Sequence, residues 1–181
     1  MTRPAAQCGH PRRAVVLGLG SIDRGDDAIG QLVAERIRDV VTERGPAGVR
    51  VVIHEDPTAL IDAMADVDIA VIVDAVRSGA PAGTVTAREV GPTEPALSAR
   101  SAPGPAGTHG LGLTAALELA RALDRLPTRV VVVGVEAVDF EHGRPQSPQV
   151  TDAVPVAVEV VLAILRGGAT VALGRVPARL P

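Results

Sequence analysis

The sequence predicts a single-domain α/β protein in which helices cover both faces of a mainly parallel sheet. Short apolar runs typical of buried strands alternate along the chain with stretches whose apolar residues recur at helical spacing. Size agrees with this class, because 181 residues with 46% hydrophobic side chains are enough for one domain with a substantial core. Neither an internal repeat nor a second domain is evident.

Strands are predicted where apolar residues run continuously or alternate with polar ones. The segment 68–76 is the most continuously apolar, so we expect it at the centre of the sheet. Residues 84–90 alternate between apolar and polar side chains, which favours an exposed edge strand. The predicted strands are 14–19, 49–56, 68–76, 84–90 and 129–136.

Helices are predicted between these strands. Apolar residues form a helical stripe from Ala28 to Val41, and the GPAG at 45–48 ends that helix. Pro155 fits best in the first turn of the last helix, where its missing N–H is tolerated. The predicted helices are 28–41, 58–65, 111–123 and 151–167.

The remaining segments are expected to be irregular. Residues 1–12 are predicted to be a flexible leader and 168–181 a flexible tail, which leaves 13–167 as the folded domain. The segment 91–108 is rich in Pro, Ala, Ser and Gly, and a loop of this length in a compact domain is usually functional or mobile.

Composition excludes several function classes. The net charge is −3 without a basic block, and Phe140 is the only aromatic residue, so nucleic acid is a poor candidate partner. All 18 basic residues are arginine, which excludes a P-loop or Schiff-base lysine. Cys8 is the only cysteine, so intrachain disulfides are excluded. We expect a cytoplasmic protein with no membrane partner, since no signal peptide and no apolar run of about 18 residues is evident.

The segment GLGSIDRGDDAIG (18–30) resembles the start of a dinucleotide-binding turn. Gly18 and Gly20 fit a GxGxxG pattern, and Glu55 or Asp56 at the end of the second strand could hold a ribose. However, Asp23 stands where the third glycine belongs, and Asp26 and Asp27 open the helix where a pyrophosphate would lie. Like charges about 4 Å apart repel by about 1 kcal/mol even in water, so this turn suits a cation better than a phosphate.

Polar residues at the carboxyl ends of the predicted strands form the candidate site, because open α/β sheets bind ligands at that edge. Taken singly, Asp26 is explained as a helix N-cap, Asp27 as an acid favoured by the helix dipole, and His109 as a surface or capping histidine. Asp74 is different, because a carboxylate at the end of a central strand is costly to bury unless it is paired or binds a cation. Together, Asp27, Asp74 and His109 form a ligand set suited to Ni²⁺, Zn²⁺ or Mn²⁺.

Four segments resemble, in the same order, the nickel–iron hydrogenase maturation endopeptidases. They are GLGSIDRGDDAIG, IVDAVRSGAPAGTV, THGLGL and VVVVGVEAVDFEHGRPQSPQV, within a resemblance that spans about residues 13–165. The resemblance implies a three-layer α/β sandwich with a twisted, mainly parallel five-stranded sheet. Ser21 stands where that family commonly has Asn, and Ala28 where it often has Gly. Glu136 matches a position where an acid or amide is frequent, with a structural or a catalytic role.

The resemblance also implies a function. It implies an endopeptidase that removes the C-terminal extension of a nickel–iron hydrogenase large-subunit precursor after nickel insertion. Asp27, Asp74 and His109 match the family's metal-binding positions, and Asp27 and Asp74 are the expected catalytic carboxylates. Nickel is expected to be carried by the substrate, although another divalent metal could bind the isolated protein, and a monomer is expected. The alternatives are a nickel-binding maturation or chaperone module without cleavage and, less favoured, a dinucleotide-dependent oxidoreductase.

Overall fold

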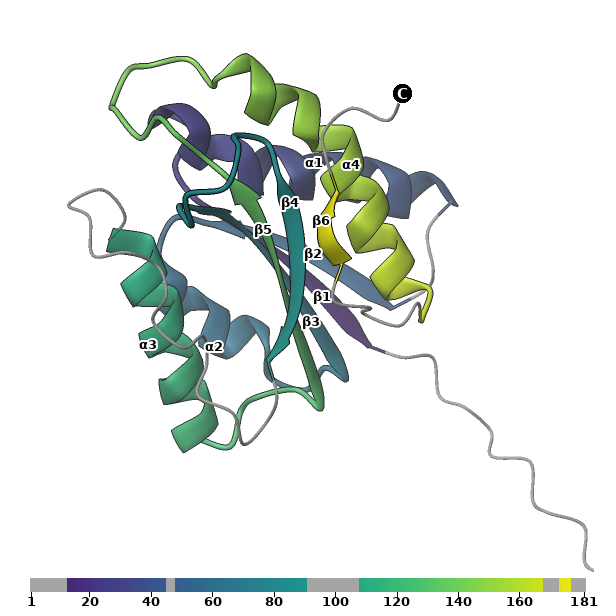
Figure 1. Ribbon diagram of the computed structural model, residues 1–181. Helices are drawn as coiled ribbons and strands as arrows, with labels where there is room; N and C mark the ends of the chain where they lie inside the picture. The colour runs from purple at the N-terminus through teal and green to yellow at the C-terminus, as the bar shows by residue number, and fades with distance from the viewer. Residues whose placement is uncertain (1–12, 45–47, 91–107, 168–172, 177–181) are drawn as a thin grey trace, which may run out of the picture.

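One six-stranded sheet forms the centre of the molecule (Figure 1). The computed structural model describes residues 13–44, 48–90, 108–167 and 173–176. Four strands of the sheet are parallel, and two antiparallel strands extend one side of it. In the sheet order β2-β1-β3-β5-β4-β6, the strands are β1 (Ala14–Leu19), β2 (Val49–His54), β3 (Ile69–Val76), β4 (Val85–Val90), β5 (Arg129–Glu136) and β6 (Leu173–Val176).

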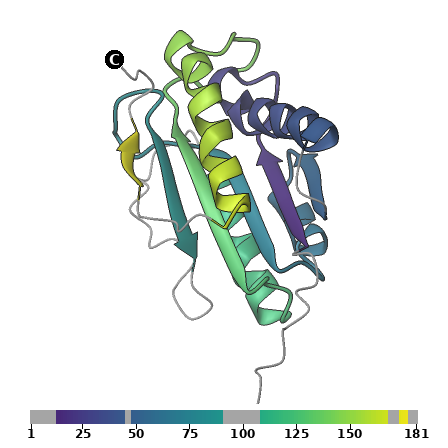
Figure 2. The same cartoon turned by 90° about the vertical axis from the view of Figure 1, so that its right-hand side faces the viewer.

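Helices cover both faces of the sheet, as Figures 1 and 2 show. The helical elements are η1 (Gly25–Ala28), α1 (Ile29–Arg44), η2 (Pro57–Ala59), α2 (Leu60–Ala63), α3 (Thr108–Ala122) and α4 (Pro148–Leu165), where η denotes a short 3₁₀ helix. Alternate residues of the strands pack against α1 and α4 on one face, and the others pack against α2 and α3 on the opposite face. The predicted three-layer α/β class is therefore confirmed.

The centre of the sheet lies where the apolar pattern predicted it. β3 is paired in parallel with β1 on one side and with β5 on the other. Its first six residues are buried because helices cover both of its faces, which explains why its apolar run does not alternate. In the β3–β5 register, Asp74 lies opposite Gly134, so this aspartate is near the carboxyl end of both central strands.

Two predictions at the other side of the sheet are wrong. Residues 84–90 were expected to form an exposed edge strand, but β4 lies between β5 and β6. The segment 168–181 was expected to be a tail throughout, but residues 173–176 form β6, which pairs antiparallel with β4. The alternation of β4 has another cause, because Val85 and Ala87 pack into the core on the α1 and α4 side, whereas Thr86 and Arg88 on the opposite face are less covered. The predicted leader 1–12 and most of the loop 91–108 lie outside the described residues.

The last helix differs from the prediction in its start. It was expected to begin at 151 with Pro155 in the first turn, but α4 begins at Pro148, after Ser147 as its N-cap residue. Proline is well suited to the first helical position because the N–H that it lacks would have no helical partner there. Pro155 therefore lies inside the helix, where it is exposed and where its missing N–H removes one hydrogen bond.

No segment of the length of a membrane span was expected, yet α4 has 18 residues with a mean hydropathy of 1.6. Within the described part of the chain it is the one helix long and apolar enough to cross a membrane by length and composition. One side of α4 packs against the sheet and α1, as expected of a helix in the core of an α/β sandwich (Figure 2).

Candidate functional site

The turn after β1 brings two aspartates into the interior. Gly20 has a φ of +119°, and a Cβ at this position would lie 1.9 Å from the carbonyl oxygen of Asp27, so only glycine fits. The chain then forms η1, in which both Asp26 and Asp27 are buried. The close approach that a dinucleotide fingerprint uses for a pyrophosphate is used here to pack the backbone against a carboxylate-bearing turn.

Asp27 faces back toward the start of this turn. Its Oδ2 accepts a hydrogen bond from the Ser21 N–H at 3.0 Å, and its side chain is 2% exposed. Because the backbone N–H of Ser21 makes this contact, the contact does not depend on the side chain at position 21. The side chain of Asp27 also lies close enough to Asp74 for its charge to act on that residue.

Asp74 ends the buried part of β3 and is also 2% exposed. Burial and, to a smaller extent, the negative charge of Asp27 raise the pKa of this carboxyl from 3.8 to about 7, and the hydrogen bond from the Ala75 N–H opposes them. Its Oδ1 is buried and has no hydrogen-bond partner in the part of the chain that the structure describes. A buried acceptor without a partner is costly, so this oxygen suits either a proton or a cation.

His109 lies in the first turn of α3, and the structure does not describe its side chain. The helix begins at the same end of the sheet as the two aspartates, because a Cβ at Gly112 would lie 3.2 Å from Pro57 Cγ in η2, just beyond the end of β2. Among the side chains that are described, which exclude that of His109, no three His, Cys, Asp or Glu residues form a group that could hold a metal. The three-residue metal site therefore stays a prediction.

Asp26 has a different role from the predicted one. The predicted N-cap is wrong, because η1 begins at Gly25 and has no side-chain cap. Asp26 is completely buried, and its carboxylate accepts three backbone hydrogen bonds from the loop between β5 and α4. The donors are Val138 N at 2.9 Å, Asp139 N at 3.0 Å and Ser147 N at 2.6 Å.

These three bonds determine the charge state of Asp26. Burial alone would raise the pKa of its carboxyl, but the hydrogen bonds outweigh burial and lower the pKa below the usual value. The two neighbouring carboxylates are thus separated in role. Asp26 is an ionised group that holds the loop 137–147 and the start of α4, while the charge of Asp27 acts on Asp74.

Glu136, at the end of β5, is a second buried carboxylate that holds a loop. Its Oε1 accepts hydrogen bonds from the N–H groups of Ser78 and Gly79, both at 2.8 Å, and its Oε2 accepts one from the Ser78 hydroxyl at 2.7 Å. Because both oxygens are occupied by the turn after β3, the geometry favours the structural role for Glu136.

The other candidates at this edge do not join the buried pair. Asp23 and Glu55 are exposed, and Asp56 accepts a hydrogen bond from the Thr58 N–H at the start of η2.

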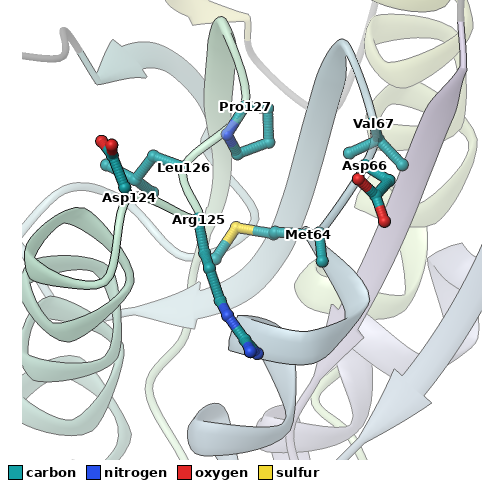
Figure 3. A pocket seen from close by; sticks show the side chains of 8 residues that line it. Met64, Asp66, Val67, Asp124, Arg125, Leu126 and Pro127 are labelled. Carbon is teal, nitrogen blue, oxygen red and sulfur yellow. The ribbon is translucent and has the colours of Figure 1, made fainter.

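A pocket in the described part of the chain lies at the opposite end of the sheet (Figure 3). It is formed by residues 64–67, which precede β3, and by residues 124–127, which precede β5. These segments lead into the amino ends of the two central strands, whereas Asp27 and Asp74 lie at the carboxyl ends. The pocket is therefore separate from the acidic pair.

Because Asp74 must lose its proton to bind a cation, metal binding should depend on pH. Below pH 7 we expect the affinity for Ni²⁺ to fall about tenfold per pH unit, since a proton and the cation compete for one carboxylate whose pKa is about 7. Calorimetric titrations between pH 5.5 and 8 measure this. A His109→Ala variant is the control, because the dependence should persist without the imidazole. An affinity independent of pH in this variant would contradict the assignment.

Fold and site together define a class of protein. It is an α/β sandwich with a buried pair of aspartates at the carboxyl edge of its parallel strands, and the pKa of one of them is raised to about 7. The family model described as hydrogenase maturation protease matches residues 55–164, more than half of the chain. The protein belongs to this family.

Individual relatives agree with this assignment. Hydrogenase expression/formation protein HupD of Thiocapsa roseopersicina is 25% identical over 160 residues, which cover 83% of this chain and 66% of that relative. An endopeptidase from Escherichia coli is 28% identical with a TM-score of 0.72, over 91% of this chain and 97% of that one. The hydrogenase maturating endopeptidase HybD from E. coli is also 28% identical, with a TM-score of 0.65, over 87% and 94% of the two chains.

Proposed function

We propose that this protein is an endopeptidase that removes the C-terminal extension of a nickel–iron hydrogenase large-subunit precursor after nickel has been inserted. Membership of the hydrogenase maturation protease family supports the reaction class. The observation that carries the proposal is the buried pair of Asp27 and Asp74, in which Asp74 Oδ1 has no partner among the described residues. On this proposal the protein acts as a monomer in the cytoplasm.

The nickel ion belongs to the substrate in this proposal. Asp27 and Asp74 supply carboxylate oxygens and His109 an imidazole nitrogen, a set that suits a borderline divalent cation. The unpartnered oxygen of Asp74 fits such a cation, because a positive charge relieves both its desolvation and the repulsion from Asp27. When bound, nickel supplies a positive charge by which the protein distinguishes a loaded precursor from an empty one.

The aspartates also suit the chemistry of peptide hydrolysis. A water molecule attacks the carbonyl carbon of the scissile peptide bond, a carboxylate accepts a proton from it, and the leaving nitrogen takes up a proton as the C–N bond breaks. We assign the acceptance of this proton to the buried pair of Asp27 and Asp74.

Cleavage is tested with purified protein and a nickel-loaded large-subunit precursor. We expect intact-mass spectrometry to show the loss of one short C-terminal segment from the precursor. Asp27→Ala should abolish this loss and leave the protein folded, with an unchanged circular-dichroism spectrum. If the wild-type protein binds the precursor but leaves its mass unchanged, the protein is a nickel-binding maturation module and the proposed peptidase activity is wrong.

A further inference from the structure

Arg77 is an exposed cation held in one place at the carboxyl edge of the sheet. It directly follows β3 and lies three residues beyond Asp74. Its Nη2 donates a hydrogen bond to the Val138 carbonyl at 2.8 Å, and its Cζ lies 5.1 Å from the centre of the Phe140 ring, the only aromatic ring of the chain. Both contacts are with the loop that follows β5.

The same loop connects Arg77 to the acidic pair. Val138, whose carbonyl accepts from Arg77, donates its own N–H to Asp26, which is the neighbour of Asp27. The backbone beyond Arg77 is fixed as well, because Ser78 and Gly79 donate to the buried Glu136. The guanidinium thus has a defined position relative to Asp27 and Asp74, since buried carboxylates hold the segments on both sides of it.

Within the described part of the chain, most of the hydrogen-bonding capacity of this guanidinium is unused. Arginine carries five N–H donors, and only Nη2 of Arg77 donates to a described acceptor. Other arginines form ion pairs, such as Arg144 with Glu141 and Arg129 with Glu89, whereas no carboxylate of a described residue pairs with Arg77. A guanidinium already fixed by a ring and a carbonyl loses little conformational freedom when it binds a carboxylate through two hydrogen bonds.

We propose that Arg77 binds a carboxylate of the precursor's C-terminal segment and thereby orients that segment across Asp27 and Asp74. This inference rests on the proposed function and assigns a specificity-determining residue to it. The ligand is a peptide carboxylate, either an acidic side chain or the terminal carboxylate. Asp27 and Asp74 lie buried at this edge and Asp139 lies in the neighbouring loop, so the fixed, exposed guanidinium offers an acidic peptide a favourable position beside carboxylates that repel it.

Binding of an uncut precursor tests the proposal without requiring cleavage. In biolayer interferometry with nickel-loaded precursor at low salt, wild type and Arg77→Gln are compared with Asp27→Ala added to both, so that the precursor stays uncut. We expect Arg77→Gln to weaken binding at least tenfold. Arg88→Gln, which removes another exposed arginine on β4, should leave binding unchanged. Wild-type protein that binds but does not cut would contradict the proposed function and leave this measurement valid. Equal affinities of wild type and Arg77→Gln would overturn the role of Arg77.

A charge exchange separates recognition from a structural role. Arg77→Glu should bind a precursor whose extension carries lysine in place of its acidic residues more tightly than the unmodified precursor. A precursor with an amidated C-terminus distinguishes the two sources, since it should lose affinity for the wild type only if the terminal carboxylate is the ligand. If Arg77→Glu prefers the unmodified precursor as strongly as the wild type does, Arg77 only supports the loop and the proposal is wrong.

Discussion

Asp74→Asn is expected to lower processing of the precursor about a thousandfold and, at the same time, to stabilise the folded protein above neutral pH. The loss of activity follows because an amide neither accepts a proton from water nor carries the charge that a cation requires. The gain in stability follows from the pKa of Asp74, which burial and the charge of Asp27 raise from 3.8 to about 7.

Because folding raises the pKa of Asp74, the free energy of unfolding should fall with rising pH. Between about pH 4 and pH 7 the unfolded chain has released the Asp74 proton while the folded chain still holds it, so the free energy of unfolding falls as the pH rises. A shift from 3.8 to about 7 corresponds to roughly 4 kcal/mol, and the full loss is present above pH 7. Asparagine does not ionise, so the variant escapes this loss.

Urea unfolding of the wild type and of Asp74→Asn at pH 5 and pH 8 measures the effect. The difference in unfolding free energy between the two proteins should be several-fold larger at pH 8. Asp152→Asn, at an exposed position of α4, is the matched control and should show no such change. If the difference between Asp74→Asn and wild type is the same at both pH values, Asp74 does not hold a proton in the folded state.

Asp26→Ala is expected to destabilise the protein by about 3–5 kcal/mol, far more than the roughly 1 kcal/mol lost with an ordinary helix cap. The substitution leaves the N–H groups of Val138, Asp139 and Ser147 without their acceptor. It also opens a cavity at a completely buried position. The stability of Asp26→Asn should lie between those of the wild type and Asp26→Ala, because its amide retains one acceptor oxygen.

Denaturant unfolding at pH 8 checks this prediction, with Asp152→Ala as the exposed control. Hydrogen exchange locates the effect, since the protection of amides in the loop 137–147 should be lost before that of β3. A loss of only about 1 kcal/mol, as for a cap, would show that the three hydrogen bonds do not hold the loop.

Local sequence was sufficient for the central elements and insufficient for the roles of the two neighbouring aspartates. β3 and β5 are apolar runs whose burial follows from their own composition, and both were predicted within a residue of their bounds. Asp26 and Asp27, in contrast, are adjacent in the same turn, so the local sequence does not distinguish their roles. They differ because the partners of Asp26 lie 112 to 121 residues away in the sequence, a separation over which spacing rules carry no information.

The predictions for the start of α4 and for the last strand of the sheet were wrong for related reasons. Ser147 and Pro148 form an ordinary helix-start signal. A proline inside a helix is disfavoured, however, so Pro155 indicated a later start for this helix. β6 is only four residues long, and its strand conformation depends on pairing with β4 rather than on a pattern of its own. The orphaned oxygen of Asp74 was foreseeable in part, since a carboxylate ending a central strand has few possible donors around it.

The source of the metal tests the proposed site most directly, because Asp27, Asp74 and His109 are proposed to recognise nickel that the precursor carries. Enzyme treated with a chelator and then freed of it is incubated with nickel-loaded and with nickel-free precursor, and cleavage is followed by intact mass. We predict full processing of the loaded precursor and none of the nickel-free one. If chelation of the enzyme abolishes processing of the loaded precursor, and Zn²⁺ added to the enzyme restores cleavage of the nickel-free precursor, the protein is a resident-metal protease and the proposed recognition of substrate nickel is wrong.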